Sequence, residues 1–417
     1  MIVPPARKTR PSLTDVLAPL AALCAWLATA LPAGGADAAA RLPDAPPLPI
    51  LAWGGPPEAH LTAERLKELA EAGFTHNFSS IGSAEGMARA LDLGNAAGVK
   101  FLLSIPELAQ DPAGTAARFK GHPALAGYYL RDEPAAGDFD GLAKWARRIQ
   151  AADAAHPCYV NLFPNYATDD QLGAPGYRPY VERFIKEVPV PLVSFDHYPV
   201  VGQSLRPEWY KNLEIVSAAA RAAGKPFWAF ALSTAHGPYP IPTTAHLRLQ
   251  AYSNLAYGAQ GLQYFMYWTS KSDTWDFHDG PIGTDGKRTV VYDRVREVNR
   301  EVQALRGVFV GSRVLAVGHT GKQVPAGTGR YEPSGPVKSL QTEGAGAVVS
   351  TLARDRRQFL VVVNRDFDQP MPLSITLDAP GGVQRVEKDG TLHTQPDGRY
   401  QGNVGPGGVA ILTWEMK

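Results

Sequence analysis

The sequence predicts an α/β protein, a (β/α)8 TIM barrel followed by a small C-terminal antiparallel β-sandwich. From residue 49, short apolar runs alternate with longer stretches of helical period, and this alternation is typical of a TIM barrel. The runs are continuous rather than alternating in polarity, as expected for strands that are buried on both faces. After about residue 309 the helical period is lost, and short strand-like segments follow one another between turn signals.

Eight apolar, β-branched or aromatic runs are the candidate barrel strands. They are Pro49–Gly54, Thr75–Ser80, Lys100–Ile105, Leu125–Arg131, Cys158–Phe163, Pro191–Tyr198, Pro226–Leu232 and Leu262–Trp268. Amphipathic stretches between and after these runs are the candidate helices, and several of them end at Gly. They are Leu61–Gly73, Ala84–Ala97, Phe139–Asp153, Tyr177–Glu187, Pro207–Ala223, Thr244–Ala259 and Tyr292–Leu305.

The chain has 417 residues, more than one compact domain usually holds, so we expect a barrel at residues 41–309 and a β-sandwich at residues 310–417. The strands predicted for the second domain are Arg313–Gly318, Ala347–Leu352, Gln358–Asn364, Leu373–Leu377, Val383–Lys388 and Gly408–Trp414. This domain has no cluster of acidic or His residues in its sequence, so its expected role is to pack on the barrel.

Residues 1–40 have the pattern of a signal peptide. Arg7, Lys8 and Arg10 precede an apolar run at Val16–Leu31, and Ala36–Ala40 offers cleavage sites between small residues. The alternative is an uncleaved membrane anchor, which the short run disfavours. The sequence therefore predicts a secreted or periplasmic protein with no stable membrane insertion after processing.

The charge of the chain bears on its partners, and its cysteine and histidine content bears on disulfides and metal sites. The formal net charge is +1, and no basic patch calls for nucleic acid or an anionic membrane, so a neutral partner such as a carbohydrate fits better. After cleavage only Cys158 remains, which excludes an intrachain disulfide and favours a buried thiol. No spacing of His and Cys indicates a metal site, and no cofactor is predicted.

Polar and aromatic residues gather where the predicted strands end, and this end of a TIM barrel carries the active site. Rings that stack on sugars, amides and carboxylates that bind hydroxyls, and acids that act on the glycosidic bond are what a carbohydrate site needs. The candidate residues for substrate binding are Trp53, His76, Asn77, Glu107, Asn161, His197, Tyr198 and Trp268, and the catalytic candidates are Asp132, Glu133 and Asp196. We expect Trp275 and His278 to form an aromatic rim, and Trp228 and Phe230 to lie in the barrel core.

Two stretches resemble the glycoside hydrolase clan that includes the family 42 β-galactosidases: GYYLRDEP at Gly127–Pro134 and LRLQAYSNLAYGAQGLQYFMYW at Leu247–Trp268. The resemblance implies that Glu133 is the acid/base residue at the end of strand four. Two positions depart from the family pattern. Asp132 replaces the Asn that precedes the acid/base Glu, and the stretch Pro226–Gly237 lacks the nucleophilic Glu of strand seven.

Glu133 is the candidate general acid, and the neighbouring Asp132 carboxylate is expected to raise its pKa. Pro134 favours an extended Glu133. The alternative role of Glu133 is structural, in an ion pair with Arg131 or at a helix N-terminus. Asp196 is the first candidate for a second carboxylate, as a nucleophile or as a base that activates water, and Glu107 is the next. It is equally plausible that Asp196 only orients His197 or a substrate hydroxyl.

Other hypotheses stay open at this point. Asp132 and Glu133 are compatible with substrate-assisted cleavage of 2-acetamido sugars, in which Asp132 orients the acetamide and Glu133 is the acid. A non-catalytic carbohydrate-binding barrel, and a lyase or transglycosylase on the same frame, are further alternatives. The distance from Glu133 to the nearest second carboxylate discriminates among the hydrolytic mechanisms.

Overall fold

The computed structural model describes residues 40–416, and residues 50–309 of this range form a closed barrel of eight parallel strands with its helices. In chain order the strands are β1 (Ile50–Trp53), β2 (His76–Phe78), β3 (Lys100–Leu103), β4 (Leu125–Asp132), β5 (Cys158–Leu162), β6 (Val193–Phe195), β9 (Phe227–Leu232) and β10 (Gly261–Phe265). Around the ring the order is β1, β10, β9, β6, β5, β4, β3, β2. The short hairpin of β7 (Val200–Val201) and β8 (Ser204–Leu205) follows β6. The predicted (β/α)8 barrel is confirmed.

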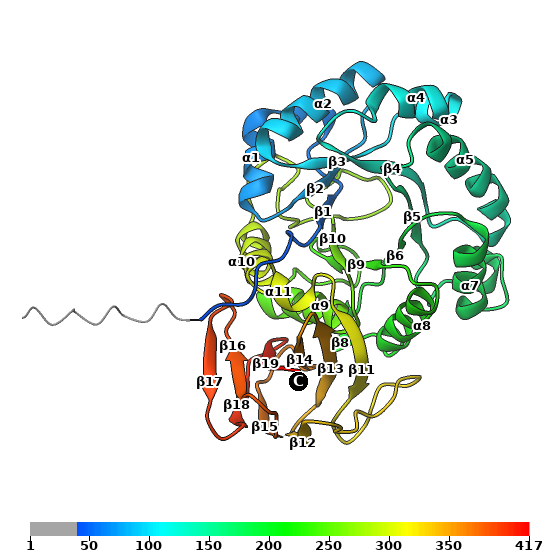
Figure 1. The fold of residues 1–417 in the computed structure, drawn as a ribbon. Helices are drawn as coiled ribbons and strands as arrows, with labels where there is room; N and C mark the ends of the chain where they lie inside the picture. The colour runs from blue at the N-terminus through cyan, green and yellow to red at the C-terminus, as the bar shows by residue number, and fades with distance from the viewer. Residues whose placement is uncertain (1–39, 417) are drawn as a thin grey trace, which may run out of the picture. The chain divides into compact units, whose positions relative to one another are not determined.

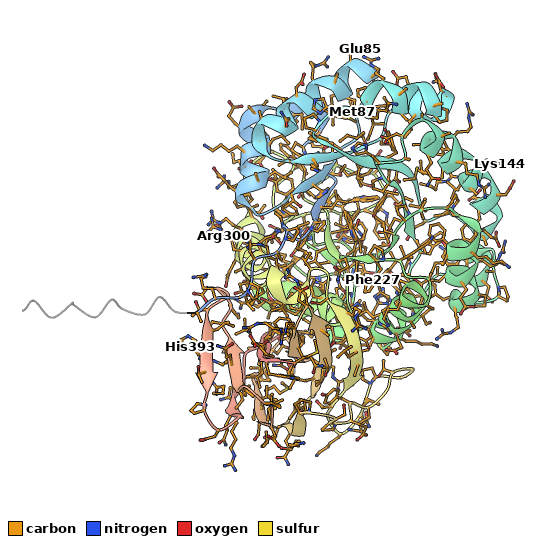
Figure 2. The ribbon with its side chains drawn as sticks, viewed as in Figure 1. Glu85, Met87, Lys144, Phe227, Arg300 and His393 are labelled. Atoms are coloured by element: carbon orange, nitrogen blue, oxygen red, sulfur yellow. The ribbon has the colours of Figure 1, made fainter. Side chains whose placement is uncertain are left out.

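Helices surround this ring of strands (Figure 1). They are α1 (Ala63–Glu71), α2 (Ala84–Ala97), α3 (Pro106–Gln110), α4 (Pro112–Phe119), α5 (Phe139–Ala152), α6 (Asp169–Leu172), α7 (Tyr177–Glu187), α8 (Trp209–Ala222), α9 (Thr244–Ala256), α10 (Val290–Ala304) and α11 (Arg306–Phe309), with 3-10 turns at Glu58–His60 and Ala136–Asp138. Figure 2 shows Glu85 projecting outward from α2, whereas Met87 lies on the barrel side of the same helix and is completely buried. The apolar face of α2 therefore packs on the strands.

Helices α3 and α4, between β3 and β4, were not predicted. Pro106 and Pro112 occupy their first positions, where the missing N–H group would have had no helical partner in any case. The side chain of Asp111 accepts a hydrogen bond from the N–H of Gly114 at 3.0 Å and so caps α4. The two prolines obscure the helical pattern in the sequence although they are well placed in the structure.

Residues after α11 form two packed antiparallel sheets, so the predicted β-sandwich is also confirmed. One sheet has the order β11 (Arg313–His319), β13 (Ala347–Arg354), β14 (Arg357–Asn364), β19 (Val409–Glu415), β16 (Val383–Val386), β17 (Leu392–Gln395). The other has the order β12 (Val337–Thr342), β15 (Met371–Leu377), β18 (Arg399–Val404). Strands β12, β17 and β18 were not predicted.

The larger sheet is buried on both of its faces. In β14, Phe359, Val361 and Val363 belong to the core shared with the barrel helices, whereas Leu360 and Val362 belong to the core between the two sheets. Helix α9 lies between the barrel and this sheet, in contact with β9 on one side and with β13 and β14 on the other. The C-terminal strands therefore complete the covering of the barrel.

The predicted signal peptide falls almost entirely on residues 1–39, which lie outside the described residues. Within residues 40–416, no helix is long and apolar enough to cross a membrane. Cys158 is fully buried at the start of β5, as predicted, and burial raises the pKa of its thiol to about 12.

Candidate active site

A cavity of about 510 Å³ opens where the barrel strands end. Trp53, Asp132 and Phe265 are the last residues of β1, β4 and β10, and all three line the cavity. The carboxyl ends of the strands are where TIM barrels carry their active sites. The other lining side chains come from strand ends and the loops that follow them: Glu133, Asn161, Phe163, Pro164, Tyr166, Ala167, Gln171, Asp196, Tyr198, Arg206, Phe230, His236, Tyr239, Trp275 and Phe277.

The carboxylates Asp132, Glu133 and Asp196 share one wall of the cavity, because they follow the neighbouring strands β4 and β6 on either side of β5. Asn161 of β5 connects them. Its Nδ2 donates to Oδ1 of Asp132 and to Oδ1 of Asp196, both at 3.1 Å. Its Oδ1 accepts a hydrogen bond from Oγ of Ser194 at 2.9 Å, which fixes the orientation of the amide. The carboxyl groups of Glu133 and Asp196 are close enough for each to influence the pKa of the other.

Neighbouring residues of a strand normally point to opposite faces, yet Asp132 and Glu133 both line the cavity. A bulge shifts the register of β4 against β5 just before Asp132, and Glu133 has a φ of 44°. The N–H of Glu133 donates to the carbonyl oxygen of Asn161 at 2.8 Å and holds this turn. The prediction that Pro134 keeps Glu133 extended is therefore wrong, because the turn into the cavity overrides the preference. Left-handed backbone at a residue other than Gly is uncommon and gathers at functional sites.

Glu133 is poised to hold a proton near neutral pH. Burial, and then the charge of Asp132, raise the pKa of Glu133 to about 7, although a hydrogen bond with Asp196 acts in the opposite direction. An ion pair with Arg131 was the structural alternative for Glu133. The guanidinium of Arg131 instead lies 3.6 Å from a carboxylate oxygen of Asp138.

The two other carboxyl groups of this wall also have raised pKa values. Burial, and then the charges of Glu133 and Asp132, raise the pKa of Asp196 well above its usual range, against hydrogen bonds from Asn161 and Tyr198. Asp132 is accessible from the cavity, but the surrounding protein still desolvates its carboxyl group and raises its pKa. Because the three groups repel one another when ionised, ionisation of one disfavours ionisation of the others.

Aromatic rings form the other half of the cavity. Trp53, Phe265 and Phe230 belong to the adjacent strands β1, β10 and β9, and the rings of Trp53 and Phe230 meet edge to face at 5.3 Å between centroids. Phe230, expected in the core, thus lines the cavity although it is buried. After β9 come Ser233 and Thr234, whose hydroxyl groups donate to a main-chain carbonyl that follows β10. No carboxylate among the described residues lines this aromatic half.

Two large aromatic side chains stand exposed at the rim. Tyr166 follows β5 and is 38% exposed, and Trp275 follows β10 and is 52% exposed. Trp275 thus lies at the predicted rim, but His278 does not line the cavity and contacts Asp279 instead. Rings at such positions are suited to stacking on the C–H faces of sugars.

Several lining residues were not among the predicted site residues. Tyr166, Gln171 and Arg206 come from the connections that follow β5 and β6, and Phe277 comes from the connection after β10. Loops have no periodicity from which the direction of a side chain can be read. The only signal in the sequence was their position downstream of a strand end.

Two of the predicted binding residues are on β2 and do not line the cavity. His76 opens β2 at the amino end of the barrel, where its Nδ1 lies 2.8 Å from Oγ1 of Thr75 and burial lowers its pKa to about 4. Asn77 is completely buried, and its Nδ2 donates to Oγ of Ser79 at 2.9 Å. Both residues precede Phe78, the last residue of β2, and neither side chain reaches the cavity.

Glu107 and His197 also lie outside the cavity lining. Oε1 of Glu107 accepts a hydrogen bond from the N–H of Ala84 at 3.0 Å, at the start of α2, because Glu107 sits in the first turn of the unpredicted helix α3. His197 is 1% exposed behind Asp196, with its ring edge-on to Tyr166, and burial lowers its pKa to about 3. In this structure Glu107 therefore binds the start of α2, and His197 packs against Tyr166.

Trp268 is another predicted stacking residue that the structure places elsewhere. It is 5% exposed and does not line the cavity. Its ring stacks on His60 at 5.2 Å, and the guanidinium of Arg65 lies over it at 5.2 Å. The strand β10 ends three residues before Trp268, so Trp268 lies beyond the strand end that lines the cavity.

Comparison with known proteins bears on the class of this site. Residues 178–305 match the family model of the family 42 glycoside hydrolases, described as β-galactosidases. The chain is a glycoside hydrolase. The matched residues run from α7 to α10 and include β6, β9 and β10. Glu133 precedes them, so its assignment depends on the geometry described above. The sequence matches no curated protein.

The glycosidase shares its fold with solved structures at low sequence identity. A β-galactosidase from Bacillus circulans sp. alkalophilus is 10% identical with a TM-score of 0.59 and covers 88% of this chain and 99% of its own. A catalytic mutant of a family 42 β-galactosidase from G. stearothermophilus is 8% identical with a TM-score of 0.58 and covers 90% and 99%. An Anoxybacillus α-amylase is 10% identical with a TM-score of 0.53 and covers 89% and 98%. These likenesses establish the architecture of barrel and β-sandwich.

Proposed function

We propose that the enzyme hydrolyses a glycosidic bond of a carbohydrate with Glu133 as the general acid. One observation carries the proposal: a carboxyl group with a pKa of about 7 faces a cavity whose other half is aromatic. A general acid must be protonated at the working pH and must reach the leaving oxygen. In the step, the proton of Glu133 passes to the glycosidic oxygen while the C1–O bond breaks. The oxygen of a water molecule then bonds to C1, and the proton that this water loses restores the acid form of Glu133.

The arrangement of the carboxyl groups argues against the usual pair of catalytic carboxyl groups on opposite sides of the glycosidic bond. A retaining glycosidase holds its two carboxyl groups about 5–5.5 Å apart, and an inverting one about 6.5–9.5 Å apart. Glu133 and Asp196 instead lie on the same wall and each influences the pKa of the other, while no carboxylate among the described residues lines the aromatic half. We therefore propose that Asp196 is a positioning residue for Glu133 rather than the nucleophile.

Substrate assistance is the second candidate mechanism. It is favoured because Asp132 and Glu133 face the cavity together and because the aromatic half, within the described chain, has no carboxylate. The acetamide oxygen at C2 of the sugar would then attack C1 of the same sugar, while Asp132 orients the acetamide N–H. Comparing aryl N-acetylglucosaminides with aryl glucosides tests this. Equal or faster hydrolysis of the glucoside would exclude substrate assistance. The remaining mechanism would be direct attack by a water molecule that a base activates.

The pH dependence of kcat/KM tests the role of Glu133 directly. Only the protonated carboxyl group donates, so activity is present below the raised pKa and is lost as pH rises through about 7. We expect kcat/KM for a glycoside with a poor leaving group, such as a methyl glycoside or a disaccharide, to fall about tenfold per pH unit above this value. A panel of such unactivated glycosides assayed between pH 5 and 9 provides the measurement. A kcat/KM that increases through pH 7 would show that Glu133 is not the acid.

We also propose that the enzyme is secreted or periplasmic, on the basis of the basic, apolar and small-residue segments of residues 1–40. The exported protein is then expected to begin between residues 36 and 41. An exported protein whose mass includes Met1 would contradict this proposal.

A further inference from the structure

Arg206 is the only arginine or lysine among the described side chains that line the catalytic cavity. It follows the hairpin β7–β8, and its N–H donates to the carbonyl oxygen of Pro199 at 2.7 Å, which anchors the backbone. The guanidinium carbon lies 4.5 Å from the ring centroid of Tyr166 and 5.7 Å from that of Tyr239. Two aromatic rings therefore hold the planar guanidinium in one place.

The guanidinium is under-used in hydrogen bonding. Nη2 donates to the hydroxyl oxygen of Tyr239 at 3.0 Å, and Nε is buried with no partner. Across residues 40–416, no carboxylate lies within 4.0 Å of it, although the same cavity holds three carboxyl groups. Arg206 is half-buried, so its guanidinium is held by the rings but stays accessible from the cavity. Four of its five N–H groups thus retain unused capacity to bind a ligand in this site.

We infer that Arg206 binds an anionic substituent of the substrate, a carboxylate or a sulfate ester on the sugar. The inference rests on the proposed function and deepens it by naming a substrate class. A guanidinium binds such oxyanions through two parallel N–H···O bonds, which gives both energy and orientation. The hydroxyl of Tyr239 and the ring of Tyr166 fix the fork before the ligand arrives.

The carboxyl groups that line the same cavity do not exclude an anionic substrate. The pKa values of Glu133, Asp196 and Asp132 are all raised, so these groups ionise less readily than ordinary carboxyl groups. An anion near this wall would further disfavour ionisation of Glu133. Binding of an acidic sugar and protonation of the general acid therefore support each other.

The test measures binding to the full chain that carries Glu133→Gln, so that no turnover intervenes. The probes are matched pairs: glucuronate against glucose, galacturonate against galactose, and galactose 6-sulfate against galactose, titrated calorimetrically below pH 7. We expect one anionic member to bind more tightly than its neutral counterpart. The pair that shows the preference, with the carboxylate or with the sulfate ester, identifies the anionic group of the substrate.

Adding Arg206→Gln should raise the Kd of the preferred anionic sugar about 10- to 100-fold, the range expected for one charge-assisted contact, and change the neutral sugar less than about 3-fold. Arg206→Lys should restore part of the preference. Arg65→Gln is the matched control, because Arg65 also lies over an aromatic ring, Trp268, but outside the cavity. Thermal melting of each variant verifies that it is folded.

If neutral and anionic sugars bind equally to the parent and to Arg206→Gln, the inference fails while the hydrolase stands. If a folded Arg206→Gln keeps the full anionic preference, another residue binds the anion and the inference also fails. If no sugar of any pair binds, both the inference and the proposed site are overturned.

Discussion

Glu133→Gln is expected to lower kcat/KM on a natural glycoside by about 10²- to 10⁴-fold, the usual contribution of a positioned general acid. Glutamine keeps the shape of the side chain but cannot transfer a proton to the leaving oxygen. Sugar affinity and the melting temperature should change little, because Gln has nearly the same size and shape as Glu and remains in the same polar cavity. The measurement is steady-state kinetics with a binding titration on the same preparation.

The dependence on the leaving group separates a lost acid from a damaged site. Aryl glycosides with activated leaving groups need little proton donation, so we expect them to lose much less activity than a natural substrate. Glu107→Gln is a matched control, since Glu107 is a carboxylate at the neighbouring strand end but only bonds the start of α2. Full activity of Glu133→Gln on a natural glycoside would show that Glu133 is not the general acid.

The same assay distinguishes two roles for Asp196. As a nucleophile or base it would be essential, and Asp196→Asn would abolish turnover. As a protonated partner it can be replaced by Asn, whose amide also donates to Glu133 and whose oxygen can still accept from Asn161. We therefore expect Asp196→Asn to retain activity within about tenfold, the scale of one perturbed hydrogen bond.

Continuous apolar runs made the barrel strands predictable. The elements that were not predicted lack such runs. Strands β17 and β18 read LHTQ and RYQGNV, so they are short, largely polar and partly exposed. The bounds of α2 and α7 agree with the predicted ones, because both helices have a clear apolar face and distinct ends.

The site was predicted best where a residue lies in the last two positions of a buried strand. Asp132 and Asn161 line the cavity as the strand ends suggested. Trp268 does not, because β10 ends earlier than its apolar run does. Arg206 was missed because its place depends on the β7–β8 hairpin and on rings from other loops. Contacts of that kind arise only when the loops pack together, and no local pattern encodes them.

Removing the β-sandwich is expected to have the largest effect on the protein itself. A chain that ends at Ser312 would expose the side of α9 that β13 and β14 cover. All residues of α9 from His246 to Ala256, apart from the partly exposed Arg248, are buried. A helix that is buried all round cannot face water without a large loss of hydrophobic free energy. We expect the truncated chain to be insoluble or unfolded, as judged by solubility and circular dichroism.

A single substitution tests the same interface without deleting any strand. Val361 is completely buried on the face of β14 that packs toward the barrel, so Val361→Asp places an unpaired charge there. We expect it to cost at least ~3 kcal/mol and to lower the unfolding midpoint of the whole chain. Leu315→Asp on β11 is the control, because Leu315 is 45% exposed and should tolerate the charge. If barrel and β-sandwich were independent, Val361→Asp would leave a separate barrel transition at its original denaturant concentration. A single, shifted transition with loss of activity is the result that the shared core requires.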